Sequence, residues 1–171
     1  MPFPVRHASG ICLPSKFAGG FTLIELLVAL AILAILAGIT IPIAQVTIQR
    51  SNEKELRLAL REIRRGIDDY HRAYIDGRIF KDISGNGYPG NLEILVSGLP
   101  DIRDPKQGKI FFLRRIPRDP MNSDLAVTES ESWGKRSYAS EADDPKEGED
   151  IYDVYSASSK VGLNGVGYSK W

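Results

Sequence analysis

The chain has 171 residues, of which 43% are hydrophobic and 26% charged, and its 22 basic residues balance its 22 acidic ones. This length allows about one domain with a modest core, and the charge balance argues against a nucleic-acid binder. The apolar content argues against a disordered chain, and a single cysteine excludes an internal disulfide framework or a multi-cysteine metal site.

The first 20 residues, MPFPVRHASGICLPSKFAGG, differ from the rest of the chain. They contain Arg6, His7 and Lys16 but no acid, and no apolar run of signal-peptide length precedes Phe21. A secretory signal cut after Ala37 is an alternative, although Glu25 would interrupt its apolar centre. Lipoprotein processing at Cys12 is less favoured, because no apolar segment precedes that cysteine.

An uncharged run follows, 24 residues long, from Leu26 to Gln49. As a helix it spans about 36 Å, enough to cross a bilayer core of about 30 Å. A buried core helix of a soluble protein is the alternative interpretation. Glu25 lies at the start of the apolar region, where an unpaired carboxylate costs a few kcal/mol. Pro42 lies inside the run, where a kink or local unwinding is expected.

After Gln49 the pattern becomes amphipathic, which predicts that the helix continues to Asp76-Gly77, with the glycine as C-cap. Its expected apolar face repeats at intervals of three to four residues and comprises Leu56, Leu60, Ile63, Ile67, Tyr70 or His71, and Tyr74. The expected opposite face carries Glu53, Arg57, Arg61, Arg65 and Asp69. It predicts ion pairs between Glu53 and Arg57 and between Arg65 and Asp69. The sequence shows no second metal ligand to accompany His71, so no metal role is assigned to it.

Residues 82–93 partly fit a calcium-loop template. Asp82, Ser84, Asn86 and Glu93 occupy ligand positions, but Pro89 stands where an apolar bridging residue is expected. A turn explains the same residues, with Asn91 capping a short helix over Leu92–Ser97. Calcium is therefore a minor alternative here.

Beyond this loop, the segment from Pro100 to Met121 is predicted to be rich in turns, because Pro117 and Pro120 preclude a regular helix. Two strands are predicted, Lys135–Ser140 and Ile151–Ala157. The acidic segment between them, EADDPKEGED, indicates a solvated hairpin loop, with a cation-binding loop as the alternative.

The string Gly20-Phe21-Thr22-Leu23-Ile24-Glu25-Leu26, after a basic leader and before an uncharged helix, resembles the class III signal of type IV prepilins and pseudopilins. The resemblance implies cleavage between Gly20 and Phe21 by a prepilin peptidase and methylation of the new Phe21 amine. It also implies that this amine neutralises Glu25 in an assembled filament, and that Pro42 lets the helix stretch. Losing the leader would remove Arg6, Lys16 and Cys12, leaving 20 basic residues, 22 acidic residues and no cysteine.

Later segments, namely Leu113–Pro120, Trp133–Tyr138, Tyr152–Ser156 and Trp171, are similar to the G-type major pseudopilin of type II secretion systems. That resemblance implies a calcium site after the last strand, built from aspartates and carbonyls. Here residues 156–165 contain no carboxylate, which disfavours tight binding of a hard cation. Ser159 and Asn164 could offer neutral oxygens, and Lys160 opposes a cation. Hydrogen bonds and the Trp171 ring are the expected alternative means of holding this loop.

The resemblance implies an α+β, type IV pilin-like fold, with a long N-terminal helix and a small C-terminal domain of short helix, turns and antiparallel strands. The expected parts are a cleaved leader, 1–20; a transmembrane and filament-core helix, 21–49; an amphipathic continuation, 50–76; and a periplasmic head, 77–171. The implied protein is not an enzyme but a pseudopilin, to which no cofactor is assigned. Its implied partners are copies of itself, minor pseudopilins, the peptidase, the inner membrane, and an assembly platform with its ATPase.

Basic residues are more numerous after the apolar run than before it, which by the positive-inside rule would place the large domain in the cytoplasm. The leader motif requires the opposite orientation, with a cytoplasmic N-terminus and a periplasmic domain. Two other functions stay open at this point. One is a type IV pilin for adhesion, motility or DNA uptake, and the other is a membrane-anchored periplasmic calcium or ligand binder.

Overall fold

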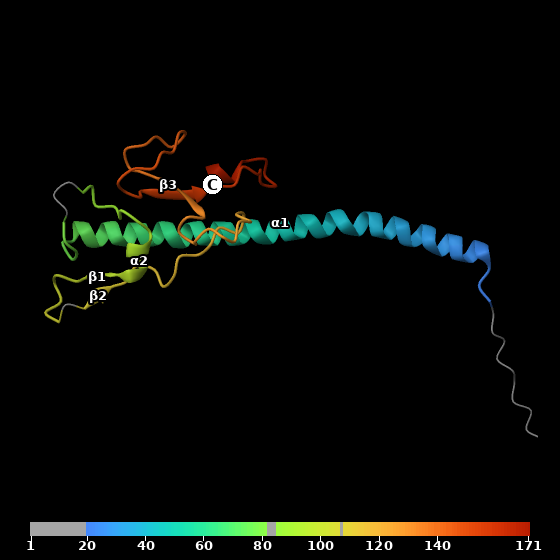
Figure 1. Ribbon diagram of the computed structural model, residues 1–171, viewed down its shortest axis with the longest axis horizontal. Helices are drawn as coiled ribbons and strands as arrows, with labels where there is room; N and C mark the ends of the chain where they lie inside the picture. Colours follow the sequence, from blue (N-terminus) through green and yellow to red (C-terminus); the bar gives the residue numbers. More distant parts are fainter. Residues whose placement is uncertain (1–19, 82–84, 107) are drawn as a thin grey trace, which may run out of the picture. The chain divides into compact units, whose positions relative to one another are not determined.

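The computed structural model describes residues 20–81, 85–106 and 108–171, with residues 39–42 described as helical backbone alone. The chain divides into two compact units, Met1–Ile43 and Ala44–Trp171. Helix α1, Leu23–Ile75, is 53 residues long and contributes to both units (Figure 1). The other helices and strands of the described chain belong to the second unit. The predicted α+β fold, with a long N-terminal helix and a small C-terminal domain, is confirmed.

Helix α1 ends at Ile75, directly before Asp76-Gly77, where the sequence predicts its end. Gly77 adopts a φ of +65°, which a residue with a side chain rarely adopts. Its backbone N–H donates to the Tyr74 carbonyl over 3.1 Å, and the Arg78 N–H donates to the Ala73 carbonyl over 2.9 Å. These two bonds satisfy carbonyls of the last helical turn, as in a Schellman motif.

Two short elements follow the helix. The predicted helix over Leu92–Ser97 is observed as α2, Glu93–Ser97, and the Asn91 side chain accepts a hydrogen bond from the Ile94 N–H over 3.0 Å. Strands β1, Leu99–Pro100, and β2, Lys109–Ile110, then form an antiparallel pair, which begins one residue before the segment predicted as turns. A two-residue strand is too short to produce an alternating pattern, so the sequence did not indicate this pair.

The second sheet pairs β3, Trp133–Arg136, with β4, Asp153–Ser156, in antiparallel fashion. Trp133 lies opposite Ser156, and Arg136 lies opposite Asp153. The predicted pairing partners are right, but β3 is earlier than the predicted 135–140. It ends at Arg136 because Ser137 bonds to the acidic loop: its N–H donates to the Lys146 carbonyl over 2.9 Å, and its hydroxyl donates to the Asp150 carboxylate.

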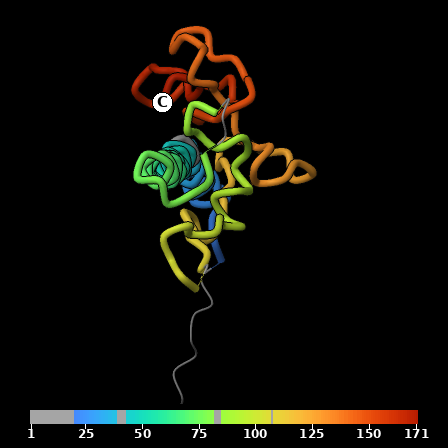
Figure 2. Tube along the Cα trace, turned by 90° about the vertical axis from the view of Figure 1, so that its left-hand side faces the viewer, coloured from blue at the N-terminus to red at the C-terminus, as the bar shows by residue number. Residues whose placement is uncertain are grey.

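The core of the second unit forms on one face of α1. The predicted apolar positions Leu56, Leu60, Ile63 and Ile67 are all buried. They pack with residues from every later part of the chain, namely Leu92, Leu95, Leu113, Trp133, Ile151, Val154 and Tyr168. Figures 1 and 2 show α2 with β1 and β2 on one side of α1 and the C-terminal segment on the other. Burial of each leucine or isoleucine contributes about 1.5–3 kcal/mol, so the helix face organises the domain.

An aromatic cluster joins the helix to the sheet. The Tyr88 ring stacks on His71 with ring centroids 4.2 Å apart, and it contacts Tyr152 at 5.0 Å. The His71 Nδ1 atom lies 3.0 Å from the Gly87 carbonyl. Tyr70, predicted as core, packs against Phe112 at the edge of the core with centroids 5.3 Å apart. The cluster therefore holds the loop after α1 against both elements.

Glu53 was predicted on the exposed face of the helix, but the structure shows it buried. The expected ion pair with Arg57 is wrong, because Glu53 is only 7% exposed and turns toward the C-terminal segment. Its Oε1 atom accepts hydrogen bonds from the Tyr168 hydroxyl at 3.0 Å, the Leu163 N–H at 2.8 Å and the Gln49 side chain at 3.4 Å. The other predicted pair is observed, with Arg65 Nε 3.9 Å from an Asp69 carboxylate oxygen.

We expect Glu53→Ala to lower the free energy of unfolding by about 2–3 kcal/mol, because it leaves buried donors of Tyr168 and Leu163 without an acceptor. Denaturant unfolding of the full chain in detergent, followed by tryptophan fluorescence, measures this. Lys54→Ala is the matched control, since Lys54 is the exposed neighbour and its loss should change stability by less than about 0.5 kcal/mol. Equal effects of the two substitutions would contradict the assigned role of Glu53.

Candidate functional site

The first turn of α1 is organised by Thr22 and Glu25. The Thr22 hydroxyl oxygen accepts a hydrogen bond from the Glu25 N–H over 3.2 Å, and the Thr22 carbonyl accepts one from the Leu26 N–H over 3.1 Å. Thr22 thus acts as N-cap, and Thr-x-x-Glu is the spacing of a capping box. Sequence reasoning missed this cap, although the spacing could have revealed it. Glu25 in the first turn also suits the positive end of the helix dipole.

The bond between Gly20 and Phe21 lies just outside the helix. Neither residue is helical, and the Phe21 side chain is 84% exposed. A Cβ atom added to Gly20 would meet nothing within 4 Å, so no described group crowds this position. A protease can therefore reach the bond without unfolding any described element. The ammonium that would pair with Glu25 forms only on cleavage, so that pair stays a prediction.

The first part of α1 is apolar on every side. All side chains from Phe21 to Gly38 are exposed, and the large apolar ones from Leu23 to Leu36 keep 52–78% of their surface. In the described chain this is the one helix long and apolar enough to cross a membrane, and none of that stretch is buried. An apolar helix without a polar face needs a membrane or other apolar helices around it. Pro42 belongs to α1, but its side chain lies outside the described residues, so its kink stays a prediction.

The calcium candidates of the first loop lie in different local structures. The Asn86 amide donates to the Asp150 carboxylate over 2.8 Å, and its carbonyl oxygen accepts from the Tyr88 N–H over 3.3 Å. Glu93 is the exposed first residue of α2. Asp82 and Ser84 lie outside the described residues. Asn86 therefore links two loops of the domain.

The candidates of the C-terminal loop, Ser159 and Asn164, are both exposed. The Asn164 side chain accepts a hydrogen bond from the Val166 N–H over 3.1 Å, which forms a local turn. Besides its bonds to Glu53, the end of the chain is held by Arg64, which donates to the Trp171 backbone oxygen over 2.8 Å. The Arg57 guanidinium lies over the Trp171 ring, 4.3 Å from its centroid. Hydrogen bonds and the Trp171 ring thus hold this loop, as the sequence predicted.

Across the described ranges, no three His, Cys, Asp or Glu residues gather in a way that could hold a metal ion. Sequence reasoning did, however, miss a buried carboxylate near the end of β4. Asp119 is fully buried and accepts a 2.6 Å hydrogen bond from the Ser156 hydroxyl and a 2.8 Å bond from the Met121 N–H. Burial raises the pKa of Asp119, and these two hydrogen bonds oppose the rise. No residue pattern around Asp119-Pro120 marks it as buried.

A comparison with protein-family models gives a match in the N-terminal part of the chain. The family model described as "Prokaryotic N-terminal methylation motif" matches residues 16–41, which include Gly20, Phe21, Glu25 and the first part of α1. A search of curated proteins and a search of solved structures found no match. The match supports a prepilin-type signal and a place in the type IV pilin superfamily, and it does not extend to the C-terminal domain.

Asp119 should make stability depend on pH. Its pKa is higher in the folded chain than its ordinary value of 3.8, so its stabilising contribution is full below that value and is lost as pH rises through the folded pKa. In Asp119→Asn this loss is removed, while the amide can still bond to Met121 and Ser156. We expect the variant to gain stability relative to the natural chain as pH rises above 3.8, the ordinary pKa of the carboxyl.

Urea unfolding of both full chains in detergent, at a series of pH values, measures this difference. Glu147→Gln serves as the control, because Glu147 is an exposed acid. A difference between Asp119→Asn and the natural chain that is constant over the whole pH range would show that Asp119 does not titrate as inferred.

Proposed function

We propose that the protein is a structural pseudopilin of a type II secretion system. In this role, copies leave the inner membrane and stack into a periplasmic pseudopilus that drives protein export across the outer membrane. The observation that carries the proposal is the prepilin-type motif Gly20–Glu25, which leads into the first turn of a helix whose first part is apolar and exposed on every side. Such a helix suits a subunit that moves from the membrane, where lipid surrounds the helix, into a filament, where the helices of neighbouring copies surround it.

The pseudopilin assignment, as opposed to a pilin, rests on the C-terminal domain. The segments similar to G-type pseudopilins meet in one place: the Trp133 indole N–H donates to the Pro117 carbonyl over 2.8 Å, and Asp119 accepts from Ser156. Major type IV pilins commonly close a C-terminal loop with a disulfide, which this chain would lack once Cys12 leaves with the leader. Hydrogen bonds to Glu53 and Arg64 hold the end of this chain instead.

Under this proposal a prepilin peptidase cuts after Gly20 on the cytoplasmic side and methylates Phe21. Residues 21–49 then span the inner membrane, with the domain from Ala44 onward mainly in the periplasm. An assembly platform with its ATPase would drive filament growth, and minor pseudopilins would share the filament. The protein acts as a structural subunit and catalyses no reaction of its own.

Glu25 would set the register of assembly. In an apolar bundle its charge is costly unless paired, and the Phe21 ammonium of the same or a neighbouring copy offers that partner. A pair of this kind favours one axial position over others, because every other position leaves two buried charges unpaired. Methylation of the amine retains its positive charge.

Intact-mass measurement of the membrane form tests the processing step. We expect a mass that lacks residues 1–20 and carries one added methyl group. Gly20→Val should block cleavage, because the side chain fits the open backbone at Gly20 but obstructs recognition by the peptidase. Gly38→Val is the matched control, since a Cβ at Gly38 also meets nothing within 4 Å, and this variant should be cut normally. An uncut natural chain would overturn the proposal.

The assembly step is tested at Glu25 with two substitutions. Glu25→Ala removes both the charge and most of the side chain, whereas Glu25→Gln removes the charge but keeps the size of the side chain and the Thr-x-x-Gln spacing of a capping box. We expect both variants to insert in the membrane and to lose at least about tenfold in filament yield, because breaking a buried pair costs about 3–5 kcal/mol.

Filaments are counted by electron microscopy after sedimentation, with membrane insertion checked by fractionation. Normal filament yield from Glu25→Gln would remove the pairing argument. Long surface fibres from the natural chain, in place of a short periplasmic filament, would favour a type IV pilin.

A further inference from the structure

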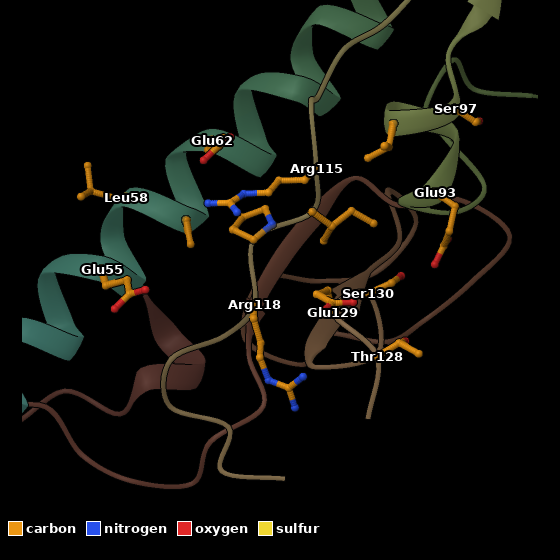
Figure 3. A pocket seen from close by; sticks show the side chains of 14 residues that line it. Glu55, Leu58, Glu62, Glu93, Ser97, Arg115, Arg118, Thr128, Glu129 and Ser130 are labelled. Carbon is orange, nitrogen blue, oxygen red and sulfur yellow. The ribbon is translucent and has the colours of Figure 1, made fainter. Parts of the chain in front are cut away.

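A groove of about 930 Å³ runs beside α1 in the second unit, between that helix, α2 and the segment from Arg115 to Arg118 (Figure 3). Four glutamates line it, Glu55, Glu62, Glu93 and Glu129, against two arginines. Arg118 is engaged by the carbonyls of Val127 and Asp124, whereas Arg115 extends across the groove toward α1. The groove is therefore acidic. We call it the acidic groove.

Among the residues that the structure describes, the glutamates of the acidic groove form no salt bridge with the two arginines that also line it. In the described part of the chain, none of the four glutamates takes part in a salt bridge. Leu58 stands on the α1 wall between Glu55 and Glu62 and is 59% exposed. An exposed leucine flanked by unpaired carboxylates fits a partner that offers both positive charge and an apolar contact.

A second groove, of about 410 Å³, lies on another side of the same helix, beside the C-terminal segment. Its charged lining is entirely basic, comprising Arg57, Arg61, Arg64 and Lys170. Arg64 is paired with Asp153, with Nε 2.7 Å from the carboxylate. Arg61 and Lys170 form no salt bridge with any residue that the structure describes. Val166 lines this basic groove as well and is 41% exposed, so it offers an apolar contact.

The two grooves are fixed relative to each other by the helix between them. At about 100° per residue, Glu55 and Glu62 lie within about 20° of each other around α1, and Arg57 and Arg61 lie about 40° apart. The centres of the two pairs are about 130° apart around the axis. They also overlap in height, because all four residues lie within two turns. One rigid element thus presents opposite charge on two separate faces at the same level.

We propose that the acidic groove of one copy receives the basic groove face of the next copy, so that Arg57 and Arg61 meet Glu55 and Glu62. Charge complementarity within a single chain favours a second copy as the occupant, and Leu58 and Val166 provide the accompanying apolar contact. Because the two faces differ, the contact is heterologous, and it builds an open helix when the rotation between successive copies does not close into a ring. This inference rests on the proposed filament function and names the surface that joins its subunits.

Charge reversal in the full chain tests this contact. Glu55→Lys with Glu62→Lys makes both faces basic, and Arg57→Glu with Arg61→Glu makes both faces acidic. Each double variant should lose at least about tenfold in filament yield, because like charges facing each other cost several kcal/mol. The fourfold variant exchanges the signs of the two faces and should assemble again. Co-expression of the two double variants should also restore filaments, as alternating copies.

The matched control reverses two exposed acids outside both grooves, Glu141→Lys with Glu147→Lys, which changes the net charge as much as the first double variant does. This control should assemble like the natural chain. Sedimentation and electron microscopy measure yield, and tryptophan fluorescence checks that each variant is folded. Recovery in the fourfold variant or in the co-expressed pair would show that a loss in the double variants is not a folding defect.

Two results separate this inference from the proposed function. If the natural chain assembles while the double variants also assemble normally, or while the combined variants stay defective, the groove contact is wrong and the filament function stands. Defects confined to the acidic groove, without rescue, would indicate a basic partner other than a second copy and would overturn the contact as well. If the natural chain is neither cleaved nor assembled, both proposals fail together.

Discussion

The apolar surface of α1 from Leu23 to Leu36 is the constraint on which the rest of the molecule depends. Its side chains are exposed in the isolated chain, with no face that is polar enough for water. No described segment of the protein covers them, so the stabilising environment must come from lipid or from other helices. The fold of Ala44–Trp171, by contrast, is complete in itself, because its core is closed by residues from every later segment.

Two carboxylates on α1 show the same difference between its exposed apolar part and the part that belongs to the folded domain. Glu53 is buried, and the chain supplies all of its partners: Tyr168, Leu163 and Gln49. Glu25 lies in the apolar part, and within the described chain its carboxylate has no hydrogen-bond or ion-pair partner. A carboxylate that is satisfied in the monomer serves stability. A carboxylate in an apolar environment is costly when the monomer gives it no partner. Its partner must then come from cleavage or from assembly.

Features set by local sequence could be predicted, whereas features set by contacts between distant segments could not. The helix, its glycine cap, the buried face from Leu56 to Ile67 and the pairing of β3 with β4 follow from periodicity and turn chemistry. Glu53 was misplaced because a charged residue beside an apolar stripe is normally exposed, and its partners Leu163 and Tyr168 lie over 100 positions away. Asp119 was missed because Ser156, which donates to its carboxylate, lies 37 positions away. The N-terminal motif was found because all its residues are contiguous.

The zero net charge of the chain takes on a different meaning once the charges are placed in space. Twenty-two bases and twenty-two acids would be uninformative if they were evenly mixed. In the domain, however, acids gather in one groove of α1 and bases in another. In an isolated copy, water and salt screen the repulsion among the like charges of each groove. When an acidic face meets a basic face and water is excluded, the attraction between the opposite charges becomes stronger. Near-neutrality overall then removes the long-range repulsion that would otherwise oppose the stacking of many identical copies.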